Sequence, residues 1–427
     1  MLKKTVRICT LLSLLTVLFG FYIQTLIPEN MYFTDGGKLE IKSLPMVTIS
    51  PKQTPFSRSV SSNSGQLKYT ARLFGVVPIK EVNISKSSSR VVSVAGTPFG
   101  IKMFSDGVMI VGFSDIPTTT GYHCPARLSG LKMGDVIVSF NDTQPKSNDD
   151  VEKFIVNNTD RPINVTFMRD GITQSCTLVP VMDSDTGVYR TGMWVRDSSA
   201  GVGTMTFYDT QQKLFAGLGH GIRDTDTQKD IKLLSGEIVP VSIMGLTKSK
   251  NGEAGELKGT FLTDIPMGKV LANSTNGVYG TIFMPPHTNM MPVATPQEIT
   301  AGKAQILTTI SGNRAKYYDI EIEKVALTSS NQNKNLVIRI TDPELLALTG
   351  GIVQGMSGSP IIQNGKLVGA VTHVFVNQVE RGYGVFAQNM LFSMDNAAKV
   401  NSAKTASADD ASARTSASDG STAGNAA

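Results

Sequence analysis

Ser357 stands in a short glycine-rich loop, Gly355-Met356-Ser357-Gly358-Ser359-Pro360. Two apolar runs follow, and Asn364-Gly365 joins them, which is the strongest short signal for a β-hairpin. Small neighbours let the backbone N–H groups of Gly355 and Ser357 point at one spot beside the serine Oγ, which is an oxyanion hole. By itself the loop also fits a structural glycine-serine turn, but it indicates nucleophilic catalysis by Ser357.

A serine nucleophile needs a base that titrates near neutral pH, which points to histidine. His220 ends a predicted strand, between Gly219 and Gly221, where small neighbours leave its ring room beside another loop. Because His220 precedes Ser357 within one predicted unit, as in chymotrypsin-like barrels, we predict that it is the base. The other histidines are in other settings: His123, His287 and His373, the last on the strand after the nucleophile.

A third side chain, a carboxylate, would fix the tautomer of His220 and stabilise the imidazolium. Asp264 lies between His220 and Ser357 in the sequence, and Asp342 precedes Ser357 more closely. Asp224 and Asp226 follow His220 directly. Spacing alone leaves these alternatives open.

Composition indicates a mainly β protein with several domains. The chain has 427 residues, 40 glycines and 18% charged residues. The net charge of +5 comes without a basic block beyond the N-terminus, so nucleic-acid binding has little support. Four histidines without clustered thiol or carboxylate partners argue against a metal site. Cys124 and Cys176 fit small core residues, although a bridge between them is open.

The two ends of the chain differ from its middle. Lys3, Lys4 and Arg7 precede an uncharged apolar stretch, which predicts a transmembrane anchor or signal segment over residues 1–28. No Ala-x-Ala site follows, so an uncleaved anchor is favoured over a cleaved signal peptide. Residues 29–72 are rich in Ser, Thr and Pro and predict a flexible tether, and 397–427 predict a disordered Ser/Ala-rich tail.

Residues 126–141, ARLSGLKMGDVIVSFN, resemble the signature of PDZ domains of the bacterial protease type, and we assign 73–185 to such a domain. The resemblance implies that Phe99, Gly100 and Ile101 form its carboxylate-binding loop and that the next strand accepts a peptide by β-augmentation. The alternative is a module that only spaces its neighbours. Many short strands and glycine turns over residues 186–396 predict a closed or double β-barrel.

The nucleophile loop resembles the Gly-x-Ser-Gly-x-Pro loop of chymotrypsin-like serine proteases. Together with TGMWVRDSSAGVGTMTFYD and GLGHGIRDTDT, the whole order resembles the stage IV sporulation protein B family of signalling serine endopeptidases. That resemblance implies a chymotrypsin-like peptidase domain with Ser357 as nucleophile, His220 as base and Asp342 as orienting acid. The hydrolysis that this resemblance implies needs no cofactor.

The family resemblance also implies a role and a place. The enzyme would lie between forespore and mother cell, membrane-anchored with its bulk outside the cytoplasm. It would cleave itself near the tether and cleave a membrane-bound regulator of an intramembrane protease that activates the late mother-cell sigma factor. The alternative is a non-catalytic, membrane-tethered PDZ adaptor. Because Met356 replaces the aspartate that switches chymotrypsin-like zymogens, we expect the PDZ unit or release from the anchor to govern activity.

Overall fold

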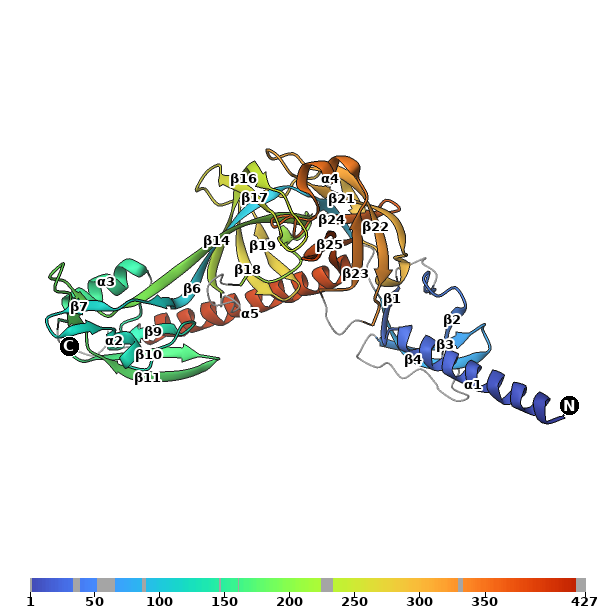
Figure 1. The fold of residues 1–427 in the computed structure, drawn as a ribbon, viewed down its shortest axis with the longest axis horizontal. Helices are drawn as coiled ribbons and strands as arrows, with labels where there is room; N and C mark the ends of the chain where they lie inside the picture. Colours follow the sequence, from blue (N-terminus) through green and yellow to red (C-terminus); the bar gives the residue numbers. More distant parts are fainter. Residues whose placement is uncertain are drawn as a thin grey trace, which may run out of the picture.

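The computed structural model describes residues 2–33, 39–51, 66–86, 90–145, 147–159, 161–223, 233–328 and 333–419. It is mainly β, as predicted, with two β-barrels at its centre and a smaller unit on either side (Figure 1). One smaller unit is inserted in the sequence between two long strands that pair with each other, and the other follows the N-terminal helix.

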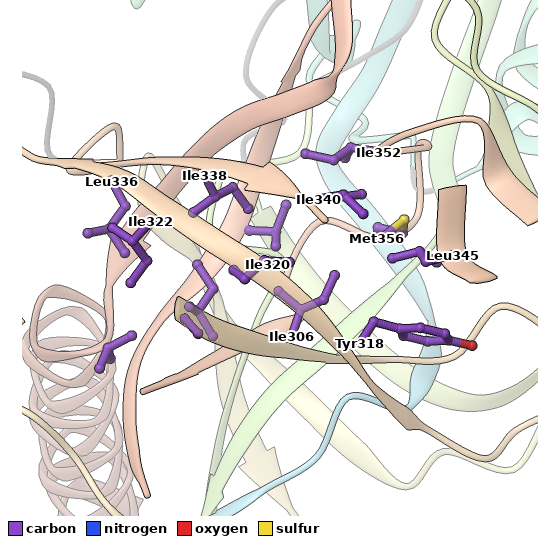
Figure 2. Close-up of a cluster of buried hydrophobic side chains, with 14 of the residues drawn as sticks. Ile306, Tyr318, Ile320, Ile322, Leu336, Ile338, Ile340, Leu345, Ile352 and Met356 are labelled. Carbon is purple, nitrogen blue, oxygen red and sulfur yellow. The ribbon is translucent and has the colours of Figure 1, made fainter. Parts of the chain in front are cut away.

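The second barrel is a closed ring of six strands. Its order is β21 (Gly302–Thr308), β22 (Lys316–Val325), β23 (Leu336–Ile340), β26 (Gln378–Phe386), β25 (Lys366–Phe375) and β24 (Pro360–Gln363). Alternation in β22 and β23 turns one face of each strand inward, where Ile320, Ile322 and Ile338 are buried (Figure 2). The predicted hairpin is present, since β24 and β25 pair across the Asn364-Gly365 turn.

The first barrel closes because β6 and β14 pair with each other at the two ends of a strand path. That path runs β6 (Pro98–Phe113), β16 (Leu233–Thr247), β18 (Gly268–Ser274), β19 (Gly277–Ile282), β15 (Leu214–Gly217) and β14 (Met193–Asp209). β17 (Glu256–Phe261) adds to β16, while β5 (Val91–Val94) and β20 (Met290–Pro292) extend the sheet beyond β14. The prediction of a double barrel is therefore confirmed.

The PDZ unit is an insertion in the first barrel, which corrects the predicted domain order. Residues 98–104 of β6 lie in the barrel, and the chain then leaves along β6 and returns along β14, which pairs with it in both places. The predicted boundaries, 73–185 and 186–396, therefore cut through the barrel, because they leave β5 and part of β6 outside it. Pairing between strands so distant in the sequence leaves no local signal.

Within the insertion, β6 continues into a sheet with β9 (Val136–Phe140), β10 (Ile163–Arg169) and β11 (Ile172–Leu178). Around it lie α2 (Pro125–Leu128), α3 (Asn148–Asn157), the hairpin of β7 (Ile116–Thr118) and β8 (Gly121–His123), and the pair of β12 (Val181–Met182) and β13 (Tyr189–Arg190). Helix α3 begins where Ser147 accepts a hydrogen bond from the Asp150 N–H. Cys124 and Cys176 are free thiols, as favoured.

The segment predicted to be a flexible tether carries ordered strands instead. β1 (Asn30–Phe33), β4 (Val77–Lys86), β3 (Gln66–Leu73) and β2 (Val47–Pro51) form one sheet, and this sheet buries an apolar core of its own that includes Met31, Ile41 and Val47. The prediction over 29–72 is therefore wrong for the described residues, because scattered apolar side chains suffice for a small core. Residues 34–38 and 52–65 lie outside the described residues.

The predicted anchor coincides with helix α1 (Leu2–Leu26), which projects from the rest of the chain (Figure 1). Ile23 and Ile27 at its end are buried in the core of the N-terminal sheet, whereas Leu11, Leu15 and Phe21 are exposed. Among the described residues, no helix combines the length and the apolar content that a membrane crossing requires.

Helix α5 (Ala387–Asp419) replaces much of the predicted disordered tail. Its first turns pack Met390, Leu391 and Met394 into an apolar cluster with strands of both barrels, and Asp395 pairs with Arg90 at 2.7 Å. The helix continues past residue 397 because alanine is the best helix former, so low apolar content alone misled the prediction. Residues 420–427 lie outside the described residues.

Candidate active site

Ser357 lies where the two barrels meet, because its neighbours are fixed in both. Met356 points into the core of the second barrel beside Leu345 and Ile340 (Figure 2) and is fully buried. Gly358 has φ +95°, and a Cβ there would lie 2.0 Å from the carbonyl oxygen of Thr204 in β14. Only glycine allows this approach, so the glycine that follows Ser357 serves the contact between the barrels.

Strand β14 holds the nucleophile loop through three hydrogen bonds. Thr204 Oγ1 donates to the Gly355 carbonyl at 2.7 Å, and its backbone N–H donates to the Ser357 carbonyl at 3.1 Å. Thr206 Oγ1 donates to the Gly358 carbonyl at 2.7 Å. Every one of these bonds uses a carbonyl oxygen of the loop, and together they fix its backbone against the first barrel.

The backbone N–H groups of Gly355 and Ser357 take part in no hydrogen bond among the described residues. Gly355 has φ +94°, a conformation that suits glycine. The Ser357 hydroxyl donates to the Thr372 carbonyl in β25 at 2.7 Å. The loop thus leaves the two N–H groups predicted for the oxyanion hole available beside Oγ, while the hydroxyl proton is held by a neighbouring strand.

His220 follows β15 and lies against the same strand of the second barrel. A Cβ at Gly219, whose φ is +70°, would lie 2.9 Å from Thr372 Cγ2, so the histidine loop packs on β25. Nδ1 of His220 is 2.8 Å from the Gly221 carbonyl oxygen. A carbonyl oxygen only accepts, so Nδ1 carries the proton and Nε2 of the neutral ring carries the lone pair. That tautomer leaves Nε2 able to take a proton.

The surroundings of His220 favour its neutral form. Burial lowers its pKa below the ordinary 6.5, the Gly221 carbonyl opposes this by stabilising the N–H, and the positive charge of Arg223 lowers the pKa further. No carboxylate among the described residues contributes to this shift. These surroundings favour a neutral His220 at neutral pH, in the tautomer that leaves Nε2 free to accept a proton.

Asp342, predicted to orient His220, has another task in this structure. It is the N-cap of α4 (Pro343–Thr349), where Oδ1 accepts from the Leu345 N–H at 3.0 Å and Oδ2 from the Asp319 N–H at 3.2 Å. Both oxygens are thus engaged with backbone donors, while His220 Nδ1 is bonded to Gly221. Asp342 therefore caps α4 here and does not orient His220. An aspartate directly before Pro is a strong signal for the start of a helix.

Asp264 does not take this place either. Asp264 is 91% exposed and pairs with Lys102 at 2.6 Å, which lowers its pKa, so it lies at the surface in an ion pair. Asp224 and Asp226 lie outside the described residues.

Phe99, Gly100 and Ile101 do not form a PDZ carboxylate-binding loop. They lie near the start of β6, in the part of the strand that belongs to the first barrel, and each pairs with β16 on one side and β14 on the other. Phe99 and Ile101 are buried in the core of that barrel. A Cβ at Gly100 would lie 2.6 Å from the Phe261 ring, so this glycine serves close packing and not ligand binding.

His373 is a residue that the sequence did not single out as part of the site. It follows Thr372 in β25, and its ring centroid lies 5.0 Å from that of His220 at an angle of 38°. A signal was present in the sequence, since the strand after the nucleophile loop returns along the same barrel junction. This signal was too weak to identify the residue, because a single polar residue near the end of an apolar strand is common.

Comparisons with known proteins agree with this architecture. Residues 122–179 match the PDZ domain model. Residues 187–391 match the SpoIVB peptidase S55 model. The chain is therefore a serine endopeptidase whose peptidase region is of the SpoIVB S55 type and which carries a PDZ domain. No curated protein matched in the corresponding search.

Several solved structures are similar in part. The inactive form of the Rv3671c protease shares 14% identity over 46% of this chain and 83% of that chain, with a TM-score of 0.27. The HtrA-type protease AlgW with a decapeptide shares 12% over 50% and 58%, with a TM-score of 0.28. The PDZ domain of an SdrC-like protein from Listeria monocytogenes shares 16% over 22% and 90%, with a TM-score of 0.18. Scores this low add nothing to the assignment.

Proposed function

We propose that this serine endopeptidase uses Ser357 as nucleophile and His220 as general base in sporulation signalling. The observation that carries the assignment is the junction of the barrels, where the Ser357 hydroxyl and the loop of His220 both contact Thr372 of β25, and where two backbone N–H groups stay available beside Oγ. Oγ would attack the peptide carbonyl, its proton would pass to His220 Nε2, and the N–H groups of Gly355 and Ser357 would hold the oxyanion.

The substrates proposed are the chain itself and a membrane-bound regulator of an intramembrane protease that activates the late mother-cell sigma factor. The basis is the family to which the peptidase domain belongs. Self-cleavage would fall near residues 52–65, which are rich in Ser, Thr and Pro. The exposed apolar side chains of α1 support attachment to a membrane, with the barrels on the outer side.

The test uses the full chain and a fluorophosphonate, which labels an activated serine. We expect labelling and N-terminal shortening in the parent, loss of both in Ser357→Ala and in His220→Ala, and parental behaviour in Ser184→Ala, an exposed serine of the PDZ unit. A folded parent that resists labelling, and does not shorten, would favour the adaptor over the enzyme.

A further inference from the structure

A hairpin of the first barrel contacts the residues of the second barrel that lead into the nucleophile loop. It consists of β16 and β17, which pair antiparallel, and of the turn between them. Backbone bonds join it to residues 349–354: the Ser249 N–H donates to the Thr349 carbonyl at 2.8 Å, and the Gln354 N–H donates to the Gly255 carbonyl at 2.7 Å. The hairpin therefore fixes the chain just before the nucleophile loop.

One further bond of this hairpin bears on the oxyanion hole. The Leu257 N–H donates to the Gln354 carbonyl at 2.9 Å. In a planar trans peptide the C=O and the N–H point in opposite directions. Because β17 holds the Gln354 carbonyl, the Gly355 N–H of the same peptide points away from the hairpin. This N–H bonds to no group within the described part of the chain, so it stays available for an oxyanion.

The other donor of the oxyanion hole is held from within the loop. The Ser359 N–H donates to the Met356 carbonyl at 2.9 Å, so the Ser357 N–H of that peptide points the opposite way. The two donors therefore differ in what fixes them. A local bond fixes the Ser357 N–H, whereas the direction of the Gly355 N–H depends on a strand of the other barrel.

We propose that β17 shapes the oxyanion hole by holding the Gln354–Gly355 peptide, with Leu257 as the positioning residue. The proposal rests on the assignment of Ser357 as nucleophile. Gly355 has φ +94°, and a glycine lacks the Cβ that would hinder its peptide from turning over. Without the bond to β17 the peptide is free to turn. The Gln354 carbonyl would then face the oxyanion and repel it.

The side chain of Ser249 ties the turn of the hairpin to the same stretch of chain. Ser249 is buried, its Oγ donates to the Ile352 carbonyl at 2.8 Å, and it accepts from the Gly255 N–H at 2.8 Å. A Cβ at Gly350 would lie 2.4 Å from the Ser249 carbonyl oxygen, so the two chains also approach closely here. The position of β17 is thus fixed by the turn as well as by its own bonds to Gln354.

This arrangement explains how the loop keeps its shape with methionine at position 356. Met356 is apolar and fully buried, so it cannot form the ion pair of the aspartate that it replaces. The backbone bonds from β17 fix the same stretch of chain without a charge. It follows that a change in the position of the hairpin changes the oxyanion hole.

Two variants of Leu257 test the proposal in the full chain. Leu257→Pro removes the N–H, and proline is tolerated on an edge strand where the N–H does not serve the ladder. Among the described strands β17 pairs with β16 alone, and the Leu257 N–H faces Gln354. Leu257→Ala loses the side-chain packing and keeps the N–H. We expect fluorophosphonate labelling to be about 100-fold slower in Leu257→Pro than in Leu257→Ala, the loss typical of an oxyanion donor.

A change in the turn tests the same hold without removing a backbone N–H. In Ser249→Ala the Ile352 carbonyl loses its donor and the Gly255 N–H loses its acceptor. We expect labelling to be about tenfold slower than in the parent. Ser235→Ala, at an exposed serine of β16, is the control and should keep the parental rate.

A second measurement observes the peptide itself and does not depend on activity. Gln354-Gly355 is the only Gln-Gly pair in the sequence, so ¹³C-carbonyl glutamine combined with ¹⁵N-glycine gives a single NMR signal that correlates the two nuclei. We expect the carbonyl shift to be alike in the parent and in Leu257→Ala, and to move upfield in Leu257→Pro, where the hydrogen bond is lost. In the phosphonylated parent the Gly355 amide proton should move downfield, and it should move less in Leu257→Pro.

The outcomes separate this proposal from the assignment of the nucleophile. Labelling that is lost in Ser357→Ala but equally fast in Leu257→Pro and Leu257→Ala would leave the serine peptidase intact and overturn the role of β17. An unchanged Gln354 carbonyl signal in Leu257→Pro would also overturn it, since the N–H would then not hold that carbonyl. Failure of the proposed function would look different, because the parent and Ser357→Ala would then label equally.

Discussion

At the scale of single residues, the proposed catalytic junction depends on backbone groups at the place where a Ser-His-Asp triad uses a side chain. A carbonyl of the chain fixes the tautomer of His220, and a carbonyl of β25 holds the Ser357 hydroxyl. Because a backbone carbonyl carries no full charge, it does not raise the pKa of the base as a carboxylate does. The base is therefore tuned mainly by its burial.

The pH dependence of labelling follows from this tuning. His220 must be neutral to act, and its pKa is lowered from 6.5 by burial. We expect the labelling rate to fall as the pH is lowered and to be halved at a pH below 6.5, where His220 becomes protonated. A rate that is halved above pH 6.5 would contradict the assignment of a desolvated His220 as the base, and His123→Ala should leave the profile unchanged.

Thr204 is the residue through which the first barrel holds the nucleophile loop. In Thr204→Val the Gly355 carbonyl loses its donor while the side-chain volume is kept. We expect a loss of about 1 kcal/mol in stability and a labelling rate lowered about tenfold, since the oxyanion donors sit in the same loop. Thr177→Val on exposed strand β11 changes a threonine without a bond to the loop and should label like the parent.

At the scale of elements, α4 shows how a capping residue resembles a catalytic one in sequence. Asp342 precedes Pro343, and Gly350 with φ +72° ends the helix, so the whole element follows ordinary helix signals. The helix packs Leu345 against Met356 in the second barrel, as Figure 2 shows. In this structure the aspartate caps the helix that packs against the nucleophile loop.

Substitutions of Asp342 distinguish the two roles. As an N-cap, Asp342 is replaced well by Asn and poorly by Ala, which costs about 1 kcal/mol. We therefore expect Asp342→Asn to keep most of the labelling rate and Asp342→Ala to increase hydrogen exchange in α4. An orienting acid would behave differently, because Asn would then lose as much activity as Ala. Equal loss in both variants would restore the catalytic interpretation.

At the scale of the whole molecule, the PDZ unit is an insertion carried on a long strand pair. β14 runs unbroken from the PDZ unit, where Met193 pairs with Phe113, to Thr204 and Thr206 at the nucleophile loop (Figure 1). The expected influence of the PDZ unit on activity therefore has a direct structural route, since one strand contacts both.

Two deletions test the insertion. Phe104 and Ser198 face each other across the strand pair, so an Asn-Gly turn in place of residues 105–197 would join β6 to β14 as a hairpin. We expect this shortened chain to unfold cooperatively on heating. A chain that begins at residue 186 should not, because it lacks Phe99 and Ile101 from the core of the first barrel. Cooperative unfolding of the second chain alone would contradict the insertion.

Local sequence signals account for the short elements of this protein. Short-range sterics set the Asn-Gly hairpin and the alternating strands, and both were predicted correctly. The same sterics place the serine in its glycine-rich loop and the histidine among glycines. Tertiary structure decided which strands pair, that β5 and β6 belong to the peptidase and that residues 29–72 include a packed sheet. It also decided that His373, and not Asp342, lies beside His220, because such contacts join residues far apart in the chain and leave no periodic signal.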